Sequence, residues 1–232
     1  MRNAGDSNRF AVGWLIPDDT RQRGGNGAPR EEGKRQRTRI LSTVTGFGAM
    51  REIRWHGRGG QGAVVAARVL TAAFDKEGKS AMAFPKYGAE RRGAPVIAFS
   101  GFDDRPIREK TELYEPDCLV VLDPTLVRSV KNLFDGIKPG AVMVINSPEA
   151  VSERYHPNLG RIGSADATRI GLEEIGRPIT NTCMLGVIAR TTNWISLDSI
   201  LASLPEYFSG KILERNLKCI QRGFDETRIT NF

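Results

Sequence analysis

Six residues, Gly57-Arg58-Gly59-Gly60-Gln61-Gly62, form the stretch of this 232-residue sequence with the clearest potential for chemistry. They lie between a short apolar run, Ile53 to His56, and a long alanine- and valine-rich segment that begins at Ala63. The pattern predicts a strand, a glycine turn and a helix in that order. Such a turn brings backbone N–H groups and a helix N-terminus to one point, which attracts anions and lets a phosphate or another backbone approach closely.

The spacing of Gly57, Gly59 and Gly62 matches G-x-G-x-x-G, the glycine pattern of dinucleotide-binding loops. A dinucleotide site also needs an acidic residue at the end of the second strand, where it holds the ribose hydroxyls. Here that strand ends in Ala83-Phe84-Pro85-Lys86, without a carboxylate. The loop is therefore interpreted as one that approaches a phosphate-bearing ligand or the active site of a partner. Glycines that serve only tight strand–helix packing remain the alternative.

A second charged loop follows that strand, with the sequence Tyr87-Gly88-Ala89-Glu90-Arg91-Arg92-Gly93-Ala94-Pro95. If the sheet is parallel, the carboxyl ends of the first two strands share one edge. Both loops then lie on that edge, and Arg58, Arg91 and Arg92 converge there as a cationic patch suited to phosphate or carboxylate. The alternative is a solvated turn in which Glu90 pairs with a neighbouring arginine.

The cysteines and histidines are not spaced as metal ligands. Cys118, Cys183 and Cys219 are far apart and make no C-x-x-C pair, whereas an iron–sulfur cluster needs four closely spaced thiolates. His56 and His156 have no second ligand at metal spacing. We therefore expect three buried, inert thiols, a hydrogen-bonded His56 at the end of the first strand, and a reducing cytoplasm as the compartment. No catalytic residue is predicted in this chain.

The formal net charge of +7 is spread unevenly along the sequence. Residues 1–49 hold nine Lys and Arg against five Asp and Glu, which leaves 25 basic and 22 acidic residues in the remainder. A body with a net charge of only +3 argues against nucleic-acid binding. Because no run of about 18 apolar residues is present, no membrane span is expected.

Residues 1–49 differ in character from the rest of the chain. The stretch from Arg21 to Arg39 is rich in Arg, Gly, Lys and Glu, and it buries too little apolar surface to offset its ordering entropy. We expect a disordered basic extension over 1–49 and a single domain over 50–232. The extension is an artefact of start-site choice, or else a basic targeting or nucleic-acid arm. Mass spectrometry of the native protein tests this, since a mature N-terminus near Met1 contradicts an artefact.

Strands and helices alternate after Met50, which indicates a Rossmann-like α/β fold with a mostly parallel sheet, helices on both faces and a helical C-terminal part. The apolar runs predict strands over 52–56, 80–84, 96–102, 118–122, 142–145 and 161–164, the last at an edge. Helical periodicity predicts helices over 63–76, 126–134, 166–175, 182–193, 197–207 and 211–226. The strand from Val96 is expected to form an antiparallel hairpin with Ile107–Lys110, and Ser196 and Ser209 are expected to cap helices.

A series of motifs, in order along the chain, closely resembles the gamma subunit of 2-oxoacid:ferredoxin oxidoreductases. They are Trp55-His56-Gly57-Arg58-Gly59-Gly60-Gln61-Gly62, Ala83-Phe84-Pro85, Tyr87 to Val96, Val121-Leu122-Asp123-Pro124-Thr125-Leu126, Asp166-Ala167-Thr168, Ile175 to Thr182 and Met184-Leu185-Gly186. The resemblance covers the chain from Met50 to its end, whereas residues 1–49 do not match. The form Glu-Arg-Arg-Gly-Ala-Pro in the second loop is similar to the pyruvate or branched-chain 2-oxoacid type.

This resemblance implies a multi-subunit enzyme. In the family, alpha and beta subunits hold thiamine diphosphate and Mg²⁺ at their interface, and [4Fe–4S] clusters reside in the beta and ferredoxin-like delta subunits. The complex cleaves a 2-oxoacid such as pyruvate, passes electrons to ferredoxin and transfers the acyl group to coenzyme A, and it can run in reverse. The gamma subunit supplies no thiamine or cluster ligand, so the resemblance implies a chain that is inactive alone.

The resemblance also suggests a role for the two loops, which would close one wall of the active site and help to admit or orient coenzyme A. The candidate residues for this contact are Gly57, Arg58, Gly59, Gly60, Gln61, Gly62, Tyr87, Glu90, Arg91 and Arg92. Among them, the arginines would meet phosphates and the glycines would allow close approach. Three alternatives stay open: a purely structural scaffold subunit, a subunit specific for 2-oxoisovalerate, and a free-standing nicotinamide oxidoreductase.

Overall fold

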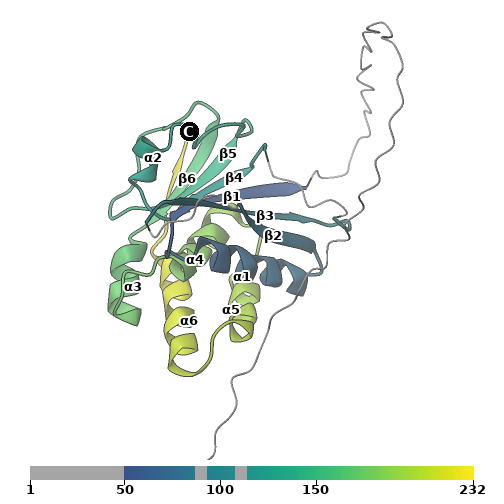
Figure 1. Cartoon of the computed structure of the whole chain (residues 1–232), viewed down its shortest axis with the longest axis vertical. Helices are drawn as coiled ribbons and strands as arrows, with labels where there is room; N and C mark the ends of the chain where they lie inside the picture. Colours follow the sequence, from purple (N-terminus) through teal and green to yellow (C-terminus); the bar gives the residue numbers. More distant parts are fainter. Residues whose placement is uncertain (1–49, 87–92, 108–113) are drawn as a thin grey trace, which may run out of the picture. The chain divides into compact units, whose positions relative to one another are not determined.

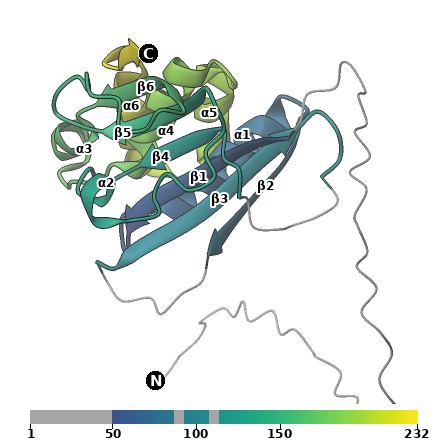
Figure 2. The same ribbon diagram turned by 90° about the horizontal axis from the view of Figure 1, so that it is seen from above.

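A seven-stranded sheet lies at the centre of the computed structural model, which describes residues 50–86, 93–107 and 114–232 (Figure 1). The strands stand in the order β2-β3-β1-β4-β5-β6-β7, which can be followed in Figure 2 from the β2 edge to β6. Their bounds are Arg51–Arg58 for β1, Ser80–Lys86 for β2, Pro95–Asp103 for β3, Cys118–Val121 for β4, Ala141–Asn146 for β5, Leu159–Ala165 for β6 and Arg228–Asn231 for β7.

The centre of the sheet is parallel and its two sides are antiparallel. Strands β1, β4, β5 and β6 run in one direction, whereas β3 is antiparallel to both of its neighbours and β7 is antiparallel to β6. Because β3 reverses between them, β1 and β2 point the same way and end at the same edge, where Arg58 pairs with Pro95 and Lys86 with Ile97. The α/β fold class is confirmed, with a sheet that is more mixed than expected.

Five of the described α-helices pack on one face of the sheet, and the short α2 lies on the other (Figure 1). Their bounds are Ala63–Lys76 for α1, Leu126–Ser129 for α2, Ala167–Ile175 for α3, Asn181–Thr192 for α4, Leu197–Ser203 for α5 and Gly210–Asp225 for α6. The core on the helical face includes Ile53 and Trp55 of β1. A second cluster on the opposite face includes Leu119 and Met143. Helices therefore lie on both faces of the sheet, as expected, but one of the faces carries only the short α2.

Strands at the two edges differ from the predictions. β2 continues past the predicted end at residue 84 and runs through Pro85. Proline is tolerated there because β2 is an edge strand with one neighbour. β6 is not an edge strand, since β7, which the sequence did not predict, pairs with it. Ile107 lies outside any strand, and the rest of the expected hairpin segment, residues 108–110, lies outside the described residues. Among the described residues, β3 forms antiparallel pairs with β1 and β2.

The prediction of a helix over 126–134 is wrong for the residues after Ser129. Val130 takes an extended backbone at φ −102° and ψ 103°, which ends α2 after four residues. Leu133 and Ile137 still reach the second core cluster, but Leu133 does so from a turn and Ile137 from the irregular segment that follows it. The apolar spacing that suggested a long helix therefore reflects burial rather than helical periodicity.

The helix-start signals have mixed outcomes. α1 has the predicted bounds, and the Ser196 side chain accepts a hydrogen bond from the Ser199 N–H at the start of α5. Ser209 occupies the N-cap position of α6 without a side-chain bond. The segment expected to be helical over 197–207 divides into α5 and a 3₁₀ turn, Leu204–Glu206, at Pro205.

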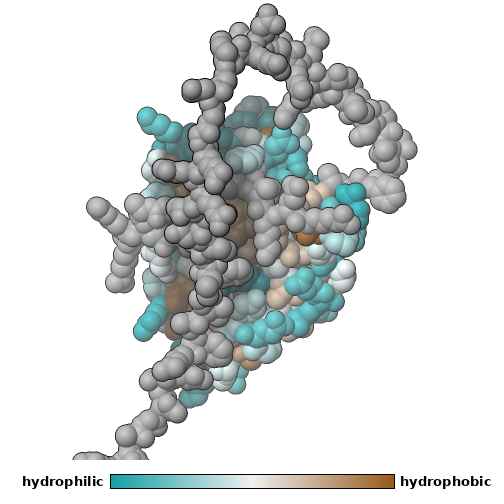
Figure 3. All heavy atoms as spheres, turned by 45° about the vertical axis from the view of Figure 1, so that its right-hand side comes forward, coloured by the Kyte–Doolittle hydropathy of each residue, from teal (hydrophilic) through white to brown (hydrophobic). Residues whose placement is uncertain are grey.

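The surface of the described part is mixed in polarity. On the side drawn in Figure 3, hydrophilic residues make up most of the visible rim, and hydrophobic ones show nearer to the centre. Among the described residues, no helix combines the length and hydropathy that a membrane crossing requires.

Candidate functional site

The glycine loop is joined to the second loop by backbone hydrogen bonds. The Gly59 N–H donates to Ala94 O at 2.9 Å, and the Gly93 N–H donates to Gly59 O at 3.3 Å. These bonds continue the β1–β3 ladder by one step past the last strand residues. The expectation that both loops lie on one edge of the sheet is met for the described end of the second loop.

Glycines set the path of the first loop. Gly60 and Gly62 have φ of 96° and 75°, in the left-handed region that favours glycine. A Cβ at Gly62 would also overlap Asn181 Nδ2. The Gln61 side chain closes the turn, because its Oε1 accepts from the Arg58 N–H at 2.7 Å. These glycines and the Gln61 hydrogen bond therefore fix the path of the loop into the start of α1.

Arg58 is engaged within the protein. Its Nε donates to Asp123 Oδ2 at 2.6 Å, one Nη to Thr125 Oγ1 at 2.8 Å and the other to Gly93 O at 3.2 Å. Partial burial alone would raise the pKa of Asp123, but hydrogen bonds from Thr125 and Arg58 outweigh it and hold that pKa below its usual range. Arg58 thus ties the end of β1 to the β4–α2 turn and to the second loop.

Two helix N-termini meet beside the loop. Gly62 is the N-cap of α1, and Asn181 is the first residue of α4. Asn181 Nδ2 donates to Gly62 O at 3.3 Å, and neither helix has a side-chain cap. Asn181 Oδ1 and Thr180 Oγ1 are buried without a hydrogen-bond partner in the described part of the chain. Buried polar atoms of this kind call for a water or a ligand.

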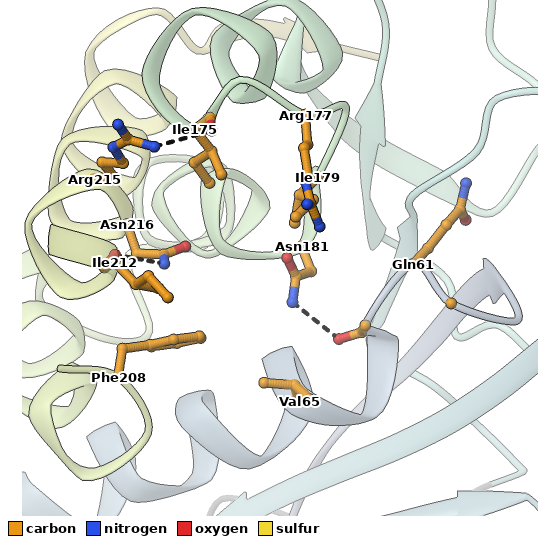
Figure 4. Close-up of a pocket in the computed structure, with 12 residues that line it drawn as sticks. Gln61, Val65, Ile175, Arg177, Ile179, Asn181, Phe208, Ile212, Arg215 and Asn216 are labelled. Atoms are coloured by element: carbon orange, nitrogen blue, oxygen red, sulfur yellow. Dashed lines mark hydrogen bonds between the residues drawn. The ribbon is translucent and has the colours of Figure 1, made fainter.

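Gly62 and Asn181 line a cavity of about 500 Å³ (Figure 4). Gly60, Gln61 and Gly62 form one wall with Val65 of α1. Figure 4 shows the remaining wall coming from the end of α3, the α3–α4 connection, the start of α4 and α6 with the segment that leads into it. Its lining residues are Ile175, Arg177, Ile179, Asn181, Phe208, Ile212, Arg215 and Asn216. The cavity is largely apolar, with two arginines and two helix N-termini at its rim, and it lies in the size range of ligand pockets.

Ion pairs between α3 and α6 hold the far wall of this cavity. Arg222 of α6 lies 2.8 Å from Glu174 and 2.7 Å from Glu173, both in α3, and 2.8 Å from Glu226 at the end of its own helix. Hydrogen bonds to these carboxylates raise the pKa of Arg222, so the group stays charged. A bridged cluster of this kind fixes the distance between the two helices more firmly than one exposed pair.

His56 lies near the end of β1 and is hydrogen-bonded, as expected. Its Nε2 accepts from Arg54 Nε at 3.1 Å, and its side chain is on the sheet face opposite α1. Burial lowers the pKa of His56 to about 3, and the charge of Arg54 adds to this effect. The imidazole is therefore neutral at physiological pH.

We predict that His56 makes the protein less stable in mild acid. Its pKa is about 3 in the folded chain and about 6.5 once the chain unfolds, so the unfolded chain binds the proton more readily. Its contribution is complete above pH 6.5 and falls as the pH decreases toward 3, by about 2 kcal/mol between pH 6.5 and 5. Urea unfolding at pH 7 and pH 5 should show this loss in the natural protein and a smaller one in His56→Gln. His156→Gln is the control, and an undiminished loss in His56→Gln contradicts the prediction.

Only part of the predicted site can be placed. Gly57 to Gly62 are described, whereas Tyr87, Glu90, Arg91 and Arg92 lie outside the described residues. Arg177, Asn181 and Arg215 line the cavity but were not predicted as site residues from the sequence. The stretch from Ile175 to Thr182 was recognised as a motif, without a role. All three cysteines are buried, and no group of three His, Cys, Asp or Glu side chains in the described ranges could hold a metal ion.

The chain is similar to known proteins over most of its length. The model of the family described as pyruvate ferredoxin/flavodoxin oxidoreductase matches residues 52–226. The pyruvate/ketoisovalerate oxidoreductases common subunit gamma of Thermococcus kodakarensis is 49% identical over 181 residues, which are 77% of this chain and 97% of that protein. Pyruvate synthase subunit PorC of Methanothermobacter thermautotrophicus is 46% identical over 177 residues, 76% of this chain and 96% of that protein.

The fold has a counterpart among solved structures. The crystal structure of pyruvate oxidoreductase subunit PORC from Thermotoga maritima matches with a TM-score of 0.68 and 34% identity, over 78% of this chain and 99% of that one. Sequence and fold thus agree with the resemblance on which the site was predicted. The chain belongs to the pyruvate ferredoxin/flavodoxin oxidoreductase family.

Proposed function

We propose that this chain is the gamma subunit of a 2-oxoacid:ferredoxin oxidoreductase, which oxidatively decarboxylates pyruvate to acetyl-coenzyme A and CO₂ and reduces ferredoxin in a reversible reaction. The family match and the names of the relatives support this role. Each of those relatives is covered almost from end to end, so the similarity extends to the whole subunit. The Thermococcus relative is named as common to pyruvate and ketoisovalerate oxidoreductases, which keeps 2-oxoisovalerate as the second candidate substrate.

The proposal includes alpha, beta and ferredoxin-like delta subunits as partners in a cytoplasmic complex. Thiamine diphosphate, Mg²⁺ and [4Fe–4S] clusters belong on those partners. The cysteines of this chain do not fit a cluster, because the three buried thiols belong to no group of three possible ligands in the described ranges. The thiamine and the clusters supply the carbon–carbon cleavage and electron transfer, and this chain contributes a binding surface.

The observation that carries the site proposal is the cavity between the glycine loop, the start of α4 and the first half of α6. It presents two uncapped helix N-termini, which favour phosphate oxygens, and two exposed arginines, Arg177 of the α3–α4 connection and Arg215 of α6. Its apolar walls suit an adenine ring or a pantetheine arm, and Asn181 Oδ1 can accept from an amino or amide N–H. We assign this cavity to coenzyme A.

In this arrangement the chain binds and orients coenzyme A without reacting with it. Arg177 and Arg215 hold phosphate oxygens, and Gly60 and Gly62 let the ligand approach the backbone of the loop. The predicted residues Tyr87, Glu90, Arg91 and Arg92 would extend this surface along the second loop. Arg58 supports the glycine loop and does not bind the ligand, since three of its donors already have partners in the protein.

The test is kinetic and uses the assembled complex. Arg177→Ala and Arg215→Ala are each expected to raise KM for coenzyme A about tenfold, since each removes a charge-assisted contact. KM for the 2-oxoacid should stay unchanged. Lys211→Ala is a matched control, because this exposed cation is also at the start of α6 but does not line the cavity. Unchanged KM values in both arginine variants with an intact complex would favour a purely structural subunit.

A further inference from the structure

A second, smaller cavity lies on the sheet face opposite α1. It has a volume of about 230 Å³ and is lined by Arg54, His56 and Lys86 on one side and by Asn132 and Asp135 on the other. Alternation along β1 explains the placement, because Ile53 and Trp55 face the helices while Arg54 and His56 face the opposite side. This cavity shares no lining residue with the one assigned to coenzyme A.

Arg54 is a buried cation with neutral partners. Only 7% of its surface is exposed, and its guanidinium donates to His56 Nε2 at 3.1 Å and to Leu133 O at 2.7 Å. Among the described residues Arg54 forms no ion pair. Asp135 and Glu52 lie beyond ion-pair distance, although their charges still act on the guanidinium. Burial lowers the pKa of Arg54, but a guanidinium remains charged at neutral pH. A buried charge is costly unless an opposite charge compensates it.

Two donor groups remain available at this cavity. No hydrogen bond from the second Nη of Arg54, Nη1, is found in the described part of the chain. Because the neutral His56 accepts from Arg54 at Nε2, its ring proton is on Nδ1, for which no partner is found there either. His56 thereby orients the guanidinium and offers an N–H without adding charge.

We propose that this cavity is a binding site for a carboxylate group, held by the Arg54 guanidinium and the His56 N–H. The cavity is too small for a nucleotide but large enough for one carboxylate. Asp135, which is exposed, reduces the positive potential without neutralising Arg54. The carboxylate comes from a free small acid or from an acidic side chain of a partner subunit, the latter resting on the proposed membership of a complex.

The first experiment uses the full chain and sodium acetate as the probe. His56 and His156 are the two histidines of the sequence, so their imidazole signals can be assigned by NMR. Titration with acetate against sodium chloride at constant ionic strength should shift the His56 signals saturably and leave those of His156 unchanged. The absence of a saturable His56 shift overturns the proposal.

Two variants of opposite sign sharpen this test. Arg54→Gln should weaken acetate binding at least about tenfold, whereas Asp135→Asn should tighten it about threefold, because it removes the competing negative charge. Asp135 is exposed, so Asp135→Asn keeps the measurement decisive if Arg54→Gln fails to fold. Equal affinity in Asp135→Asn and the natural chain contradicts the site.

The assembled complex then separates the two sources of the carboxylate. If a partner side chain fills the site, assembly abolishes the acetate response, and Arg54→Gln weakens association with the other subunits at least about tenfold. If a free acid fills it, the response persists in the complex and association is unchanged. Arg51→Gln is the control, since Arg51 is on the same strand but exposed and paired with Asp117.

Discussion

Replacing Gly186 with alanine is expected to lower the stability of the folded chain by about 3 kcal/mol, which corresponds to a fall in Tm of roughly 6–12 °C. Gly186 lies in α4 where that helix crosses α6, and a Cβ there would overlap Ile220 O and come within 2.6 Å of Phe224 N. Both are backbone atoms of α6, so the clash cannot be relieved by rotating a side chain. The intrinsic helix preference for alanine, about 1 kcal/mol, offsets only part of the cost.

The facing helix repeats this arrangement, since a Cβ on Gly223 of α6 would overlap Cys183 O of α4. The two glycines allow α4, which is buried along nearly its whole length, to pack closely against α6. Urea unfolding of Gly186→Ala is the measurement, and Gln221→Ala, an exposed position on α6, is the control that should change stability by less than about 0.5 kcal/mol. A Gly186→Ala variant as stable as the control would show that the helices can separate without penalty.

Local patterns in the sequence predicted α1 with its observed bounds, because a glycine precedes it, a glycine follows it and its apolar positions recur with helical spacing. β7 shows the opposite case. Arg228–Asn231 has no apolar run, and it becomes a strand only by pairing with β6, more than sixty residues earlier in the chain. Whether such a segment becomes a strand depends on its pairing with a distant segment, and the spacing of residues along the chain does not show that pairing.

The candidate site likewise has one part that the sequence predicted and one part that it did not. The glycine loop could be found in the sequence because its pattern occupies six consecutive residues. The opposite wall, with Arg177 and Arg215, comes from the α3–α4 connection and from α6, and only the packing of α6 against α3 and α4 brings it to the loop. The motif around Arg177 was a usable signal, but no pattern in the sequence connected it to the loop.

Arg58 was expected to bind phosphate, and its contacts in the protein lead to a different prediction. Because β1 and β4 are neighbours, the loops that follow them meet, and Asp123 accepts from Arg58 as well as from Thr125. Arg58→Ala should therefore free the glycine loop from the β4–α2 turn. We expect kcat/KM for coenzyme A to fall about tenfold in the complex and the chain to lose about 1 kcal/mol of stability, since the pair is partly solvated.

Asp123→Asn distinguishes a supporting arginine from one that binds the ligand. If Arg58 acts by fixing the loop, Asp123→Asn weakens the same contact, reproduces most of the loss in kcat/KM, and the double variant is little worse than Arg58→Ala alone. If Arg58 instead contacts a phosphate, Asp123→Asn releases it toward the ligand and leaves KM for coenzyme A equal or lower. Asp104→Asn, which removes an exposed ion pair with Lys79 on another surface, is the control. An unchanged KM for coenzyme A in Asp123→Asn would indicate that Arg58 contacts the ligand. A raised KM would indicate that the β4–α2 turn helps to position the glycine loop.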